Sequence, residues 1–256
     1  MKTRLLATQL AVALALFAST SSIGAQEKTQ LLVRVTASDA KIVGSGVGGV
    51  RITVRELASG RVLAEGIQEG GTGNTRTIMF AKERGGTIYD TDGAAGFLAE
   101  LSIDEPTIVE IVAEGPLGTP DALRRSTKTM LMLPGQHVLG EGVILEIQGF
   151  TVQMETPGDG PVARGAPFEV RGKVTMLCGC PTQPGGMWDS DDYRILIRAS
   201  QGDRMLGEWP MEFAGETSWY TTEVTLDVAG DVELTMIAMD ASKGNFGMTD
   251  GKVTVR

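Results

Sequence analysis

The chain has 256 residues, with 23 basic residues, 32 acidic residues and one histidine, so its formal net charge is −9 at pH 7. This negative charge repels nucleic acid and anionic membrane surfaces, which excludes both as expected partners. The 34 glycines and the low aromatic content, 5%, indicate a chain with many turns. With one histidine and two cysteines, the sequence offers few groups for hydrolase or metal-enzyme chemistry.

The first 25 residues are typical of a secretory signal peptide. Lys2 and Arg4 precede an apolar run at 5–18, and small residues follow this run. The run is too short to span a bilayer comfortably, and no later segment has the length of a membrane span. We expect cleavage after Ala25, with the bond after Gly24 as the alternative. The mature protein, with net charge −11, would then be periplasmic or secreted.

The segment 26–148 is predicted to form a first β-sandwich. Apolar and polar residues alternate with a period of two, which favours strands with one buried face, at 30–37, 50–57, 97–103 and 107–114. Glycine-rich clusters between these segments indicate turns. A short helix is expected at 119–125, with Pro120 in its first turn, and a last strand after His137.

The segment 149–256 is predicted to form a second β-sandwich, of the seven-strand immunoglobulin-like type. Its expected strands are 150–157, 168–177, 192–199, 204–213, 219–228, 231–240 and 251–256. No low-complexity linker precedes Gly149, so the two domains are expected to contact each other. The predicted fold class is therefore all-β, with two tandem sandwiches after the signal peptide.

Two stretches resemble known families. In the first half these are GVGGVRITVRELASGRVLAEGIQEGG and YDTDGAAGFLAEL, where Thr91, Asp92 and Gly96 match a turn of carboxypeptidase-regulatory or transthyretin-like domains and Gly93 is displaced from the usual spacing. In the second half, DVELTMIAMDASKGNFG is similar to the last hairpin of bacterial Ig-like modules. Both resemblances imply folds that host adhesion, stalk and accessory roles more than catalysis.

The most distinctive segment is MLCGCPTQPGGMWDSDD at 176–192, which contains both cysteines. An oxidising compartment favours a disulfide between Cys178 and Cys180, and Gly179 permits the necessary tight turn. Such a bridge would add little stability because it closes almost no loop. Alternatively, the two thiolates could bind Cu(I) together with Met176 and Met187. A thiol-redox role lacks the usual C-x-x-C spacing.

The order of strands in a seven-strand sandwich predicts where this segment lies. The loops 178–191 and 241–247 should meet at the end of the second domain where the first domain enters. Carboxylates from several loops at such a junction are candidate calcium ligands, or else solvated acids that cap turns. The candidate calcium ligands are Asp189, Asp191, Asp192 and Asp240, and the candidate binding residues are Trp188 and Asn245.

No catalytic residue is predicted, because no serine lies in a nucleophile-elbow context and His137 lies alone between turn residues. The favoured function is an exported, non-catalytic binding or accessory protein. Its protein partner or small ligand would bind at the Cys-Gly-Cys-Pro loop, with copper or calcium as candidate ions. The alternatives are a structural, adhesion or stalk module with a tight disulfide, and a thiol- or copper-redox protein.

Overall fold

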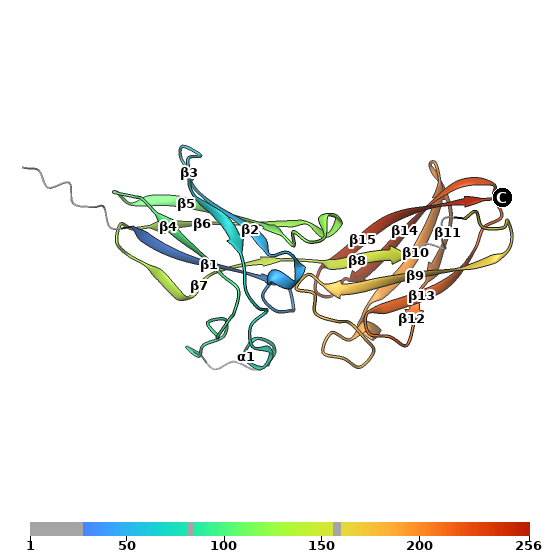
Figure 1. Ribbon diagram of the computed structural model, residues 1–256, viewed down its shortest axis with the longest axis horizontal. Coiled ribbons are helices and arrows are strands. Elements are labelled where there is room, and N and C mark those ends of the chain that lie inside the picture. Colours follow the sequence, from blue (N-terminus) through green and yellow to red (C-terminus); the bar gives the residue numbers. More distant parts are fainter. Residues whose placement is uncertain (1–27, 81–83, 156–159) are drawn as a thin grey trace, which may run out of the picture.

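The computed structural model describes residues 28–80, 84–155 and 160–256. The predicted signal peptide lies outside these residues. The model confirms the all-β prediction, since two β-sandwiches lie end to end along the long axis of the molecule (Figure 1).

The first sandwich packs the three-stranded sheet β4-β1-β7 against the four-stranded sheet β3-β2-β5-β6. Its strands are β1 (Thr29–Ala37), β2 (Val50–Glu56), β3 (Val62–Gln68), β4 (Phe97–Leu101), β5 (Thr107–Gly115), β6 (Arg124–Met132) and β7 (Val138–Ile147). β1 and β7 are parallel, and the other pairs are antiparallel. A short helix, α1 (Thr75–Met79), lies in the long connection between β3 and β4, where the Asn74 side chain caps its first turn.

The second sandwich packs the sheet β11-β10-β14-β15 against the sheet β12-β13-β9-β8. Its strands are β8 (Phe150–Glu155), β9 (Pro167–Met176), β10 (Arg194–Gln201), β11 (Arg204–Pro210), β12 (Glu212–Phe213), β13 (Trp219–Thr225), β14 (Gly230–Asp240) and β15 (Asn245–Val255). The hairpin of β14 and β15 is paired along its whole length. This arrangement of strands is immunoglobulin-like.

Four elements differ from the sequence prediction. The expected strand 204–213 is two strands in two sheets, because the chain crosses at the buried Met211 next to Pro210, which cannot donate to a ladder. The expected helix 119–125 is only the 3-10 turn η2 (Pro120–Ala122). The edge strands β3 and β6 were not predicted from alternation, because their side chains are mostly exposed on both faces.

Most of the buried apolar side chains of both sandwiches form one continuous cluster. At the junction this cluster includes Ile147 at the end of β7, Phe150 at the start of β8, and the loop residues Cys178, Cys180 and Trp188. Inter-domain contacts in a chain are usually polar and mobile unless they are large and apolar. The shared cluster therefore indicates that the two sandwiches are packed together rather than merely tethered.

Candidate functional site

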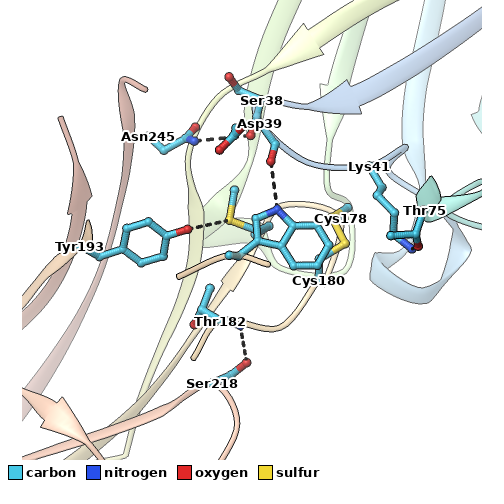
Figure 2. Close-up of a disulfide and its surroundings, with 12 residues drawn as sticks. Ser38, Asp39, Lys41, Thr75, Cys178, Cys180, Thr182, Tyr193, Ser218 and Asn245 are labelled. Atoms are coloured by element: carbon cyan, nitrogen blue, oxygen red, sulfur yellow. Dashed lines mark hydrogen bonds between the residues drawn. A yellow bond between two sulfur atoms is a disulfide. The ribbon is translucent and has the colours of Figure 1, made fainter. Parts of the chain in front are cut away.

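The two cysteines form a disulfide inside a tight turn that follows β9 (Figure 2). Their Cα atoms are 5.4 Å apart, within the range that a bridge requires. Gly179 between them has a left-handed φ of 77°, and its N–H donates to the carbonyl of Met176 at 2.8 Å. Both cysteines are buried. Of the alternatives left open by the sequence, the model supports the disulfide, in which neither sulfur is a thiolate.

The base of the loop is fixed by a buried hydrogen-bond network on the second sandwich. The Thr182 backbone N–H donates to the Ser218 hydroxyl at 3.1 Å, and the Thr182 hydroxyl donates to the Val174 carbonyl at 2.7 Å. The Thr182 and Tyr220 hydroxyls are 2.8 Å apart. Every polar group of this threonine therefore has a partner, which gives the loop one defined position on its own domain.

Trp188 connects the loop to the first sandwich. Its side chain is only 6% exposed and belongs to the same apolar cluster as the disulfide. Its indole Nε1–H donates to the backbone carbonyl of Asp39 at 2.9 Å, 149 residues away along the chain. Asp39 has a positive φ of 53°, a conformation that aspartate tolerates in tight turns. A residue predicted to bind a ligand is thus occupied by a contact within the molecule.

The turn between β14 and β15 adds a second set of contacts across the junction. The Asn245 side chain is buried, accepts a hydrogen bond from the Gly149 N–H at 2.8 Å and donates to the Ser38 carbonyl at 3.4 Å. Lys243 forms an ion pair with Asp39 at 2.8 Å. This hydrogen-bonded ion pair raises the pKa of the Lys243 amine, against a smaller opposing effect of desolvation. Figure 2 shows Ser38, Asp39 and Asn245 beside one another near the disulfide.

Of the four predicted calcium ligands, two accept hydrogen bonds from neighbouring turn residues and two are exposed. The Asp189 carboxylate accepts hydrogen bonds from the N–H groups of Gly185 and Asp191, and so caps the 3-10 turn η3 (Ser190–Asp192). The Asp240 carboxylate accepts from the backbone N–H and the hydroxyl of Ser242. Asp191 and Asp192 are exposed. Across the ranges that the model describes, no three His, Cys, Asp or Glu side chains gather in a way that could hold a metal ion.

The two methionines of the proposed soft-metal set have different surroundings. Met176 is buried, with its sulfur 4.0 Å from the Tyr193 hydroxyl, whereas Met187 is exposed. The Tyr193 ring also packs against Phe150, with ring centroids 4.9 Å apart. Burial raises the pKa of the Tyr193 phenol, and the nearby Asp240 and Asp39 carboxylates raise it further. The phenol is therefore neutral at physiological pH, and its contacts with Phe150 and Met176 lie within the second sandwich, at the end next to the junction.

Sequence reasoning missed the first domain's share of this junction, which includes Ser38, Asp39, Val47 and Arg124, whose guanidinium donates to the Phe246 carbonyl at 3.1 Å. Ser38 and Asp39 lie in the turn after β1, and nothing in the local pattern marks them as partners of a loop in the other half of the chain. The only available signal was indirect. Ser38 and Asp39, two residue types that favour turns, follow a predicted strand, which predicts a turn but not what that turn contacts.

Comparisons with known proteins find no family, and they find solved structures of low similarity. No protein-family model matches the chain, and no curated protein is similar to it. The fibronectin(III)-like modules of Clostridium thermocellum CbhA are 13% identical, over 86% of this chain and 87% of that chain, with a TM-score of 0.29. Dpr2 Ig1–Ig2, solved in complex with DIP-Theta Ig1–Ig3, is 11% identical over 89% of this chain and 99% of that chain, with a TM-score of 0.29.

An engineered protein solved at 1.98 Å is 19% identical over 49% of this chain, which spans 24% of that chain, with a TM-score of 0.31. The carboxypeptidase-regulatory resemblance of the first half has no matching family model and stays a prediction. In the described ranges, no helix is long and apolar enough to cross a membrane.

Proposed function

We propose that this protein is an exported, non-catalytic structural or adhesion module in which the segment 176–192 locks two β-sandwiches into one rigid unit. The observation that carries the proposal is the contact of Trp188 with Asp39. A large aromatic side chain from the distinctive loop is buried against the neighbouring domain, with its one polar atom hydrogen-bonded there. Residues that bind a ligand would instead keep an open surface or cavity.

The disulfide supports this role by shaping the turn rather than by closing a long loop. It joins residues two apart, so the chain-entropy model assigns it only about 1.5 kcal/mol of stabilisation. The turn lies against the first domain, because a Cβ built on Gly179 would be 2.9 Å from the Val47 Cγ1 atom. By restricting the conformations of this turn, the disulfide therefore also keeps it in the conformation that contacts the first sandwich.

Export is proposed from the signal-peptide pattern together with the disulfide, which persists in oxidising compartments. The copper and thiol-redox alternatives require free thiolates, which a buried disulfide does not offer. They are tested directly by elemental mass spectrometry and by counting free thiols in the mature protein. The structural role predicts no bound copper and no reactive thiol, whereas stoichiometric copper would overturn it.

The rigid junction is tested by measuring distances between spin labels on the two domains. Labels at Ala58→Cys and Asp203→Cys, which are exposed turn positions of the first and second sandwich, should give one narrow distance distribution. Labels at Asp191→Cys and Asp203→Cys, at the two ends of β10 within one domain, provide the reference width. A distribution across the junction that is much broader than this reference would contradict the proposal.

A further inference from the structure

The outer face of the sheet β11-β10-β14-β15 carries a contiguous group of apolar side chains, here called the outer apolar patch. It consists of Leu196 on β10, Ile237 and Met239 on β14, and Phe246 and Met248 on β15. Leu196 pairs with Ile237, which pairs with Met248, and Met239 pairs with Phe246 in the next outward-facing row. Phe246 is 50% exposed and Met248 is 53% exposed.

The patch does not belong to the core of the sandwich. Ile195 and Ile197 point inward into the apolar cluster, whereas Leu196 between them is only 2% exposed and lies outside that cluster. Its neighbours on the outer face therefore cover it. An antiparallel sheet usually presents polar residues on its solvent side, so a contiguous apolar group there marks an interaction surface. The sandwiches lie end to end (Figure 1), and the first domain contacts this sheet at its near end, where the Arg124 guanidinium donates to the Phe246 carbonyl at 3.1 Å. The Phe246 side chain nevertheless remains half exposed.

The charges around the patch are arranged in a way that fits a second copy of the chain. Glu208 on β11, Arg198 on β10, Thr235 on β14 and Asp250 on β15 lie in one cross-strand row beside the patch, and Glu208 forms an ion pair with Arg198 of its own chain at 2.6 Å. Arg198 and Asp250 thus lie on opposite sides of β14. If two copies pack face to face about a two-fold axis parallel to β14, Arg198 of each copy faces Asp250 of the other. The same axis places Leu196 of one copy over Met248 of the other, and the Ile237 side chains of the two copies over each other.

The alternative two-fold axis, perpendicular to the strands, is less favourable. It would exchange the row of Arg194 with the row of Arg198 and so place these two arginines of β10 against each other. In each chain a single carboxylate, that of Glu208, pairs with both arginines, so one positive charge per chain is left unbalanced there. Like charges brought together at an interface oppose association. With the axis parallel to β14, Arg194 instead faces the Phe246 ring, where a cation is favoured.

We propose that this face is a homodimer interface, formed by two outer apolar patches about an axis parallel to β14. With this axis β10, β14 and β15 of one copy face the same three strands of the other. Three strands about 4.8 Å apart and about eight residues long give a face of about 400 Å². This is below the roughly 800 Å² per partner of standard stable interfaces, so the dimer should be weak, with a Kd in the micromolar range. This inference is independent of the proposed rigid junction, which rests on Trp188.

Sedimentation velocity of the mature chain over about 1–100 µM tests the dimer. The wild-type protein should shift from monomer to dimer over this series, and Met248→Asp should weaken the Kd at least about tenfold. Met205→Asp is the matched control, because Met205 is 62% exposed on β11 of the same sheet but lies outside the patch. A wild-type chain that stays monomeric, or a dimer that Met248→Asp does not weaken, overturns the proposal.

A charge exchange tests the orientation of the two copies. Arg198→Glu and Asp250→Arg should each weaken the dimer, because each brings like charges together across the interface. The double variant should restore most of the wild-type affinity, since the pair is re-formed with the charges exchanged. Thermal unfolding shows that each variant remains folded, which matters because Arg198 also pairs with Glu208 of its own chain. A double variant as weak as the single variants overturns the proposed axis.

Discussion

Replacing Trp188 with phenylalanine should destabilise the junction without unfolding either sandwich. The variant loses the 2.9 Å hydrogen bond to the Asp39 carbonyl, a partly buried acceptor, which costs about 1–2 kcal/mol. The smaller ring also leaves space in a site that is only 6% exposed, which adds about 1 kcal/mol. We therefore expect a loss of about 2–3 kcal/mol, and Trp188→Ala should cost about 3–5 kcal/mol or more.

Urea unfolding followed by circular dichroism measures this effect. If the shared cluster couples the two domains, the wild-type protein should unfold in one transition and the Trp188 variants should unfold in two, because the domains become independent. Trp219→Phe is the matched control. Trp219 lies on β13 under the Arg171 guanidinium, 4.4 Å from the ring centroid, and its loss should cost only about 0.5–1 kcal/mol. A Trp188→Phe protein with wild-type stability and one transition would refute the reasoning.

Three further perturbations address the same junction. Gly185→Ala should lower the free energy of unfolding in urea by about 1 kcal/mol, through its positive φ of 65° alone. Gly179→Ala, with a φ of 77°, should lower it by at least about 1 kcal/mol more, because the added Cβ would meet Val47. Equal losses in the two variants would contradict the contact between the turn and Val47. Asn245→Ala leaves two backbone groups of the junction without a partner and should lower the free energy of unfolding by about 2–3 kcal/mol, and a loss below about 0.5 kcal/mol would argue against the two bonds. The pKa of Tyr193 is raised in the folded protein, so its contribution to stability is present below pH 10 and is lost as the pH rises above it, at up to about 1.4 kcal/mol per pH unit. In Tyr193→Phe the free energy of unfolding should fall less steeply with pH above pH 10. An unchanged slope would show that folding does not protect the Tyr193 phenol from deprotonation.

Most of the fold could be predicted from local pattern. The strands with one buried face, such as β5 and β14, alternate clearly because burial on one side selects every second residue. The edge strands β3 and β6 escaped prediction because neither of their faces is fully buried. The split between β11 and β12 also escaped, since a crossing between sheets leaves the apolar character of the segment unchanged.

The site was predicted less completely than the fold. The cysteine pair and Trp188 stood out because a long Cys, Pro, Gly and Asp segment between two strands is unusual in itself. Their chemistry stayed open, since the same two thiols suit a bridge or a soft metal until the backbone brings the Cα atoms to 5.4 Å. The carboxylates at Asp189 and Asp240 illustrate the same limit, because a turn cap and a metal ligand use the same oxygen atoms.

The amino-acid sequence by itself determined the all-β class, the distinctive loop and the acidic surface, because alternation, turn residues and charge are local properties. Only the tertiary structure decided what the loop contacts. Trp188 meets Asp39 across 149 residues, and Asn245 meets Ser38 across 207 residues. Contacts over such separations depend on which ends of the two sandwiches meet and at what angle, and this packing is set by the shared apolar cluster rather than by any one segment.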